Sequence, residues 1–309
     1  MASVTQVQAR RTSSHRKRKL LDQLIAYSFI APNFIGFAVF TLVPLVFALA
    51  LSFMNWDGAN SISFAGLDNF RRLFRDKVFI KALINTLVYT AATVPLTLVA
   101  SLALALLLNS RIFARNFFRT VSFFPYVASL VAVAAVWNML FSPSMGPVNM
   151  LLSKVFKVSA EDLPRWAADK DWAMTTVVMF SIWKYMGYYM VIFLAGLQNT
   201  NPELYEAAAL DGANPQQKFW HVTLPQLRPT TFFVLMMLII TSFKVYDIIY
   251  NITQGGPGNA TMVLVYYIYN TAFVSWDLGY ASAISMVLFL LVLGITLLQF
   301  RGERHFDDI

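Results

Sequence analysis

The chain has 309 residues, of which 58% are hydrophobic and only 13% are charged, and it contains no cysteine. Soluble globular domains carry about 25% charged residues, so this composition indicates an integral membrane protein. Without cysteine there can be no disulfide or thiolate metal site, and three widely spaced histidines do not favour a metal cluster. The net charge of +8 is best interpreted as basic residues that fix membrane topology, and we expect no nucleic-acid partner.

Long stretches without charge predict the segments that cross the lipid bilayer. Four such runs have 34, 29, 34 and 23 residues, and a crossing helix needs about 20. Two further apolar segments are interrupted only by Lys184, and by Lys244 with Asp247. The predicted fold is therefore all-α, a polytopic transmembrane helical bundle. Its six spans are expected near residues 25–53, 82–109, 120–141, 173–198, 230–252 and 278–300.

Two segments between the spans are predicted to lie at the outer membrane interface. Residues 261–276 follow a Gly-Gly-Pro-Gly run, are short for a crossing, and carry interfacial tyrosines and a tryptophan. Residues 70–78 place apolar side chains at positions 70, 73, 74 and 78, opposite arginines, which predicts one amphipathic surface helix.

Basic residues predict the orientation. The first span follows a basic tail over residues 1–24, but its apolar part is about twice the 7–15 residues of a signal peptide, so we expect it to remain attached. If both termini are cytoplasmic, 13 Lys and Arg residues lie inside and 9 outside. This bias favours a cytoplasmic basic tail, a transmembrane domain over residues 25–300 and a cytoplasmic tail over residues 301–309.

The connection over residues 199–229 is the most polar long loop, and it is predicted to form a helix–turn–helix. Asn201 can cap a helix that starts at Pro202, and Gly212 with the preceding aspartate ends it. Asn214 and Pro215 repeat the start signal. Small alanines beside large aromatic residues are typical of a docking surface.

The residues Glu206-Ala207-Ala208, Gly212 and Leu224-Pro225, at their spacing, resemble the EAA loop of ATP-binding-cassette importer permeases, with Val222 where isoleucine is usual. Leu224-Pro225 is expected to end the second helix. Residues 64–70 and 253–257 extend the resemblance to the carbohydrate-uptake branch, the maltose, lactose and glycerol-phosphate type. This resemblance implies the type I importer permease fold and a bacterial cytoplasmic (inner) membrane location.

The resemblance also implies that the loop is a coupling helix that contacts an ATPase subunit. The residues that it assigns to this contact are Glu206, Ala207, Ala208, Asp211, Gly212, Leu224 and Pro225. The chain has no G-x-x-x-x-G-K-[ST] motif, so it is not expected to be an enzyme or to hold a cofactor, and ATP and Mg²⁺ belong on the partners. The implied partners are a second homologous permease, two ATP-binding subunits and an extracytoplasmic solute-binding protein that delivers a sugar-like substrate.

Charged groups near the bilayer centre cost about 2.5–3.5 kcal/mol each, so they rarely face lipid. Lys244 and Asp247, three residues apart, either form an ion pair or line a substrate cavity with Lys184 and the neighbouring aromatic residues. By resemblance, Tyr188 matches a sugar-contacting tyrosine and Ser242 falls near a sugar-contacting position, whereas Leu238 and Val245 replace polar residues. The predicted substrate-binding set is Trp183, Lys184, Tyr188, Ser242, Lys244 and Asp247.

Three other functions stay open. An importer permease for a non-sugar solute keeps the same loop. An ion-coupled secondary transporter predicts internal repeats and interrupted helices at the membrane midplane, and no convincing repeat is present. A membrane scaffold without transport activity predicts spans that lack polar residues such as Lys184.

Overall fold

The computed structural model describes residue 23 and residues 25–110, 113–159 and 162–307. The predicted tail over residues 1–24 lies outside these residues except for Gln23, as do the last two residues of the chain. The described residues are almost entirely helical, with a small hairpin in which β1 (Met54–Asn55) pairs antiparallel with β2 (Ser63–Phe64). The predicted all-α class is confirmed.

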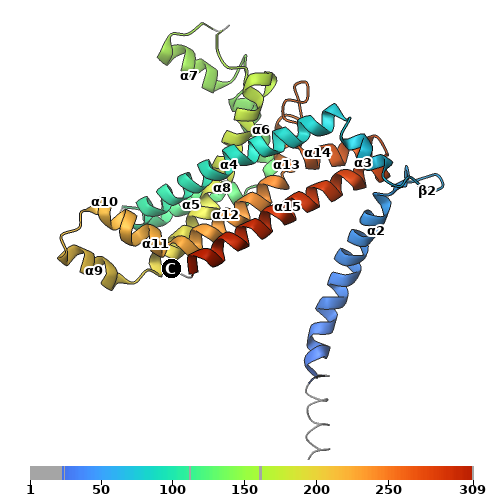
Figure 1. The fold of residues 1–309 in the computed structure, drawn as a ribbon. Coiled ribbons are helices and arrows are strands. Elements are labelled where there is room, and N and C mark those ends of the chain that lie inside the picture. The colour runs from blue at the N-terminus through green and yellow to red at the C-terminus, as the bar shows by residue number, and fades with distance from the viewer. Residues whose placement is uncertain (1–22, 24, 111–112, 160–161, 308–309) are drawn as a thin grey trace, which may run out of the picture.

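Four helices are long and apolar enough to cross a membrane. They are Ile25–Leu51, which ends in α2 (Val43–Leu51), α4 (Lys77–Asn109), α8 (Lys170–Gln198) and α15 (Leu278–Asp307). Their apolar parts have 27, 33, 29 and 25 residues, and a crossing needs about 20. In Figure 1, α4, α8 and α15 lie in one elongated bundle, together with the fifth predicted span, while α2 leads away from it.

The third predicted span is a broken helix. α5 (Arg115–Val127) and α6 (Leu130–Leu140) meet at 101°, so the prediction of one continuous helix over residues 120–141 is wrong. Pro125 stands in the last turn of α5, and the chain leaves the helix after Val127, where Ala128 has an extended backbone with a ψ of 147°.

The fifth predicted span, residues 230–252, is interrupted as well, and the prediction of a continuous helix is again wrong. α12 (Arg228–Phe243) stops three residues before α13 (Asp247–Ile252) begins. No glycine or proline stands at this interruption. Phe243 and Val245 are both buried there, and the N–H groups of Lys244 and Val245 donate to the carbonyls three residues earlier, at 3.2 and 3.3 Å.

The contact between α4 and α8 forms the centre of the bundle. Along α4, short hydroxyl side chains are buried at helical spacing: Thr86, Thr90, Thr93, Thr97 and Ser101. Small polar residues of this kind let membrane helices approach closely. The hydroxyl of Tyr89 on α4 donates a hydrogen bond to Ser181 Oγ on α8 at 2.8 Å, which joins the two helices.

At the end of the bundle where α4 begins, the predicted surface helix is divided. α3 (Asp68–Leu73) ends where Leu73 is buried, and Phe74, predicted on the same apolar face, is 84% exposed. Asp76 then starts α4 by accepting the backbone N–H of Val78 at 2.8 Å. The prediction of one amphipathic helix over residues 70–78 is therefore wrong, because the cap of α4 interrupts it.

A shorter helix, α14 (Leu264–Tyr269), lies at this same end. It packs against α4 and α15, and the N–H of Leu264 donates to Thr86 Oγ1 at 2.9 Å. This segment is helical as predicted, and its position relative to the membrane stays a prediction. α7 (Pro147–Phe156) projects from the bundle (Figure 1).

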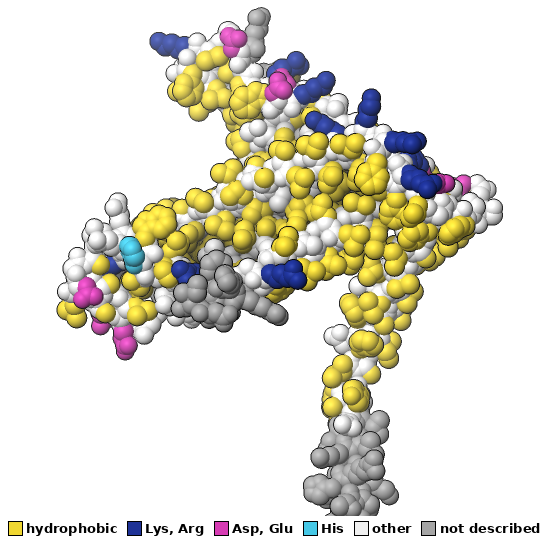
Figure 2. Space-filling model, viewed as in Figure 1, with side chains coloured by type: hydrophobic (Ala, Val, Ile, Leu, Met, Phe, Trp, Pro, Cys, Tyr) yellow, Lys and Arg dark blue, Asp and Glu magenta, His cyan; other side chains and the backbone are white. Residues whose placement is uncertain are grey.

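The helix Ile25–Leu51 differs from the other long helices in how little of it is covered. Only 6% of its most apolar window is buried, compared with 33% for α4 and 56% for α8. Figure 2 shows it as a largely hydrophobic arm that leaves the bundle. Most of its apolar surface is therefore left for lipid or for another polypeptide.

Candidate functional site

The loop between α8 and α12 folds into two helices at one end of the bundle, beside the C-terminal end of α15 (Figure 1). α9 (Pro202–Leu210) starts at Asn201, whose side chain accepts a backbone N–H of the first turn at 3.0 Å. α10 (Pro215–Lys218) starts at Asn214, which forms a reciprocal capping box with Gln217 at 2.8 and 2.9 Å. The predicted helix–turn–helix is confirmed.

The turn between the two helices depends on Gly212, which has a φ of +76°. No heavy atom lies within 4 Å of a Cβ built there, so the backbone conformation, and not crowding, favours glycine. The hydroxyl of Tyr205 on α9 donates to Thr223 Oγ1 of the second helix at 3.0 Å. The loop is thus a fixed structure with its own internal contacts.

The second helix runs from Pro215 through a π-helical turn into α11 (Leu224–Gln226) and then meets α12 at 66°. It ends one residue after Leu224-Pro225, so the prediction that this pair ends the helix is confirmed. Pro225 stands directly after the π-helical turn over Phe219–Thr223, and the missing N–H of a proline is tolerated in the first turn of a helical segment.

The surface of the loop carries most of the residues predicted to contact an ATPase. Exposed residues of the set are Glu206, Ala207, Asp211 and Gly212, while Ala208, Leu224 and Pro225 are half-buried. Sequence reasoning missed Leu210, which is 90% exposed as the last residue of α9. Its place directly before Asp211-Gly212, where the helix must end, is the signal that could have found it.

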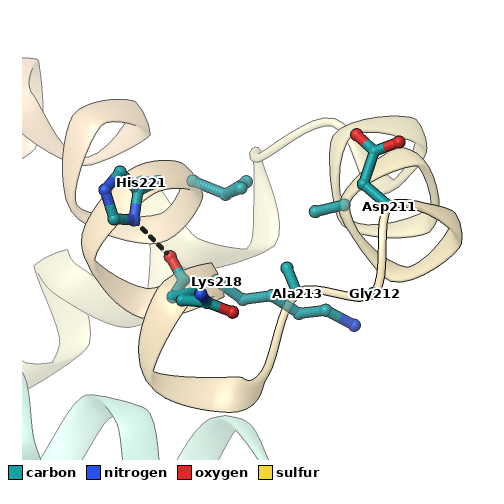
Figure 3. A pocket seen from close by; sticks show the side chains of 8 residues that line it. Asp211, Gly212, Ala213, Lys218 and His221 are labelled. Carbon is teal, nitrogen blue, oxygen red and sulfur yellow. Dashed lines mark hydrogen bonds between the residues drawn. The ribbon is translucent and has the colours of Figure 1, made fainter.

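A hollow of about 270 Å³ separates α9 from the second helix. It is lined by Ala208, Asp211, Gly212, Ala213, Gln217, Lys218, His221 and Val222. In Figure 3, Asp211 lies on the α9 side, and Lys218 and His221 lie across from it. His221 Nδ1 and the Gln217 carbonyl are 3.0 Å apart. The loop therefore presents both signs of charge around a shallow concave surface.

Lys184, in the middle of α8, is only 6% exposed. Its ammonium donates hydrogen bonds to the carbonyl oxygens of Pro125 at 3.0 Å and Ala128 at 3.4 Å. These carbonyls stand at the C-terminal end of α5, where the break leaves them without backbone partners. Lys184 therefore lies at the bend between α5 and α6.

The neighbouring residues of α8 hold α5 at close range. A Cβ at Gly187 would stand 1.8 Å from the carbonyl oxygen of Ser122, so only glycine allows this backbone approach. The Tyr188 ring stacks on Tyr126 of α5, with ring centroids 4.3 Å apart and 16° between the planes. Tyr188 is half-buried, and one edge of this aromatic pair is accessible.

Three of the four remaining residues of the predicted substrate set, Ser242, Lys244 and Asp247, lie at the second helix break. Lys244 and Asp247 flank the interruption between α12 and α13, and both are exposed. The alternative of an ion pair between them is wrong, because no such pair forms among the described residues and the helix that would align them is broken. Ser242 is buried one turn earlier, and Trp183 is half-buried beside Trp137, at 5.4 Å between ring centroids.

Sequence reasoning also missed a polar cluster at the opposite end of the bundle. Asp76 accepts hydrogen bonds from the hydroxyls of Tyr267 and of Tyr280, the latter at 2.6 Å. Arg72 pairs with Asp277 at 2.6 Å and lies 3.9 Å from the centre of the Tyr280 ring. The two tyrosines are 191 and 204 residues from Asp76, so no local pattern could have linked them.

Electrostatics at this cluster favour the charged form of Asp76. Partial burial acts to raise the pKa of Asp76, but hydrogen bonds from Tyr267, Tyr280 and two backbone N–H groups outweigh burial and lower it. The cluster therefore fixes the start of α4 against α14 and α15 as long as Asp76 is ionised.

Interrupted membrane helices around buried polar groups, with a structured helical loop at one end, define the class of polytopic membrane transport proteins. The family described as "Binding-protein-dependent transport system inner membrane component" matches residues 97–304. The chain belongs to this family. Interrupted helices, expected above for a secondary transporter, are therefore present in a permease of the binding-protein-dependent class and do not separate the two functions.

Relatives over nearly the whole chain carry related names. The lactose transport system permease protein LacF of Rhizobium radiobacter is 34% identical over 95% of this chain and 99% of its own length. The sn-glycerol-3-phosphate transport system permease protein UgpA of Yersinia pestis is 34% identical over 90% of this chain and 93% of its own. The probable ABC transporter permease protein YurN of Bacillus subtilis is 34% identical over 91% and 96%.

Solved structures share the fold. A chain of a bacterial ABC transporter that imports the acidic polysaccharide alginate matches with a TM-score of 0.81 and 25% identity, over 94% of this chain and 99% of that one. A second alginate transporter structure, in complex with a pentasaccharide-bound periplasmic protein, matches with a TM-score of 0.81 and 26% identity, over 93% and 96%. The predicted type I importer permease fold is confirmed.

Proposed function

We propose that this chain is the membrane-spanning permease subunit of an ATP-driven, binding-protein-dependent importer for a sugar or related polyol. The observation that carries the proposal is the structured loop over residues 199–229, which combines the Glu-Ala-Ala and glycine pattern with an exposed surface at one end of the bundle. A loop that is held by helix caps and internal hydrogen bonds can be displaced by another protein without unfolding.

In this proposal the loop couples the permease to a nucleotide-hydrolysing partner. Glu206, Ala207, Ala208, Asp211 and Gly212 lie on or beside the exposed face of α9 and the turn that follows it. Leu224 and Pro225 belong to the second helix, where both are half-buried and support the exposed face. ATP and Mg²⁺ bind two partner subunits, and this chain moves the solute.

The substrate path is proposed to pass the two helix breaks. Trp183 and Tyr188 offer aromatic faces that pack on the C–H surface of a sugar, and Lys244 with Asp247 offers groups for its hydroxyls. Ser242 lies at the same break. Lys184 is buried against the end of α5.

The substrate class follows from the relatives' names, which specify lactose, sn-glycerol-3-phosphate, arabinooligosaccharides and alginate. All of these compounds carry two or more hydroxyl groups, so we propose a sugar or a polyol derivative. A non-sugar solute is the second possibility, and uptake assays with both classes decide between them.

The proposed assembly has a second permease subunit, and the uncovered helix Ile25–Leu51 gives it a surface to occupy. A solute-binding protein delivers the substrate at the outer end, where α3 and α14 lie. The loop and both termini face the cytoplasm, in accord with the bias of basic residues. Transport is by alternating access between two global states biased by nucleotide and substrate.

The test uses the fact that the chain has no native cysteine. Single cysteines replace Trp220 in the loop and Met145 at the outer end, where both side chains are exposed. In intact cells, a membrane-impermeant maleimide is expected to label the Met145→Cys variant and spare the Trp220→Cys variant. External labelling of Trp220→Cys, or purified complexes that never retain an ATPase, would refute the proposal. Uptake that persists without ATP but requires an ion gradient would favour a secondary transporter.

A further inference from the structure

The bend between α5 and α6 leaves carbonyl groups without backbone partners inside the bundle. The last four carbonyls of any helix lack an intrahelical donor, and the C-terminal end of a helix carries partial negative charge. Here the chain turns by 101° directly after α5, so α6 cannot supply the donors. A group from another helix must do so or the carbonyls stay unsatisfied, which is costly away from water.

Lys184 supplies those donors from α8. Its ammonium reaches Pro125 O at 3.0 Å and Ala128 O at 3.4 Å, on the two sides of the last turn of α5. The register is set one turn away, where the backbone of α5 at Ser122 contacts Gly187. Lys184 therefore meets the end of α5 because the glycine three residues later lets the two helices touch.

No carboxylate lies within ion-pair distance of Lys184 among the described residues, whose ion pairs are Arg71–Asp68 and Arg72–Asp277. The partners of its buried charge are carbonyl dipoles. This arrangement makes the ammonium part of the helix bend itself. Lys184 is also only 6% exposed, which leaves little of it to meet a solute.

The direction of α6 matters because α6, which follows the first helix break, contacts α13, which follows the second. Asn138 on α6 donates its side-chain N–H to the carbonyl of Asn251 on α13 at 3.1 Å. α13 begins at the break that holds Lys244 and Asp247. A change in the α5–α6 angle therefore moves the outer halves of both broken helices together.

We infer that Lys184 is a positioning residue for transport: its ammonium fixes the angle between α5 and α6, and with it the outer half-helices α6 and α13. The role in transport rests on the proposed function, while the role in the bend does not. Lys184→Met keeps the length of the side chain but removes its charge and its hydrogen-bond donors. Lys184→Arg keeps the charge and the donors.

The first measurement is the bend itself, in the purified chain in lipid nanodiscs. Spin labels on cysteines that replace Phe117 on α5 and Met139 on α6, both exposed, report their separation by electron paramagnetic resonance. We expect Lys184→Met to shift or broaden the distance distribution and Lys184→Arg to restore it. An unchanged distribution in Lys184→Met would overturn the inference.

The second measurement is ATP-driven uptake by the assembled transporter with its binding protein. Loss of a hydrogen bond to a charged group predicts a maximal rate about tenfold lower in Lys184→Met, with an unchanged half-saturating substrate concentration and recovery in Lys184→Arg. A raised half-saturating concentration at an unchanged maximal rate would overturn the positioning role and assign Lys184 to the substrate. If the wild-type complex shows no ATP-driven uptake, the proposed function fails, and the spin-label distances still decide the role of Lys184 in the bend. If Lys184→Met does not fold, Lys184→Leu, which also removes the charge and the donors, takes its place in both measurements under the same criteria.

Discussion

Gly187→Ala is expected to separate α5 from α8. The added Cβ would stand 1.8 Å from the Ser122 carbonyl oxygen and 2.5 Å from its carbon, both backbone atoms. Ordinary contact begins at 3.4 Å, so the two backbones must move apart by 1.6 Å along this line, the difference of the two distances. Such a shift carries Lys184 away from Pro125 O, now at 3.0 Å, and breaks that hydrogen bond.

The expected magnitude follows from overpacking. Forcing an extra methyl group into a close contact costs about 1–3 kcal/mol, and loss of the Lys184 hydrogen bond adds to it. We therefore expect Gly187→Ala to unfold at a clearly lower temperature and to transport more slowly. The assay is the thermal midpoint of the detergent-purified protein by size-exclusion fluorescence, together with ATP-driven uptake.

The matched control is Gly294→Ala on α15. A Cβ at Gly294 has no heavy atom within 4 Å, and both substitutions replace glycine by the better helix former in a long helix. Gly294→Ala should therefore be neutral or stabilising. If Gly187→Ala matched Gly294→Ala in midpoint and in uptake, the close approach of α5 and α8 would not exist as described.

Three further predictions concern other parts of the chain. Because Gly212 has a φ of +76°, Gly212→Val should destabilise the folded loop by about 1–2 kcal/mol and reduce ATP-driven uptake. Gly212→Asn should stay close to wild type, and equal uptake by the two variants would contradict this prediction. Asp76 has a lowered pKa, so its stabilisation is present above the unfolded-state pKa of about 3.9 and disappears as pH falls through the folded-state value. The thermal midpoint of Asp76→Asn should thus lie below that of wild type at pH 7, with the gap closing below about pH 4; a pH-independent gap would refute the assignment. Tyr188→Ala should lower uptake while the ATPase subunits still co-purify, and Tyr188→Phe should keep the 4.3 Å stack on Tyr126 and more of the activity; equal loss in both would assign the effect to the hydroxyl.

The sequence predicted those elements whose cause is local. Runs without charge locate the long helices, because desolvation of charge dominates in lipid. Asn201, Gly212 and Asn214 predict the loop helices, because caps and a left-handed turn depend on the residues themselves. The family pattern in the loop then pointed to a permease, and the comparisons bear this out.

The helix breaks were beyond such reasoning because their causes are partly distant. Pro125 was visible in the sequence, but prolines are common in membrane helices, and Pro95 inside α4 leaves that helix in one piece. What differs at Pro125 is the donor that Lys184 brings from α8, 59 residues away. After Phe243 no glycine or proline marks the break, so no single-sequence pattern encodes it.

The position of α12 suggests how the loop and the breaks act together. α12 has 16 residues, about 24 Å at 1.5 Å per residue, and it joins the loop bend at Leu227 to the break after Phe243. Leu227 is fully buried, so the bend is held in the core and a tilt of the loop must turn α12 as a lever. The far end of α12 leads to α13, and Asn138 of α6 hydrogen-bonds to α13. The angle of α6 is fixed in turn by Lys184, as inferred above. If the proposed function holds, movement of the loop by a partner reaches the second helix break through α12, and the first through α13 and α6.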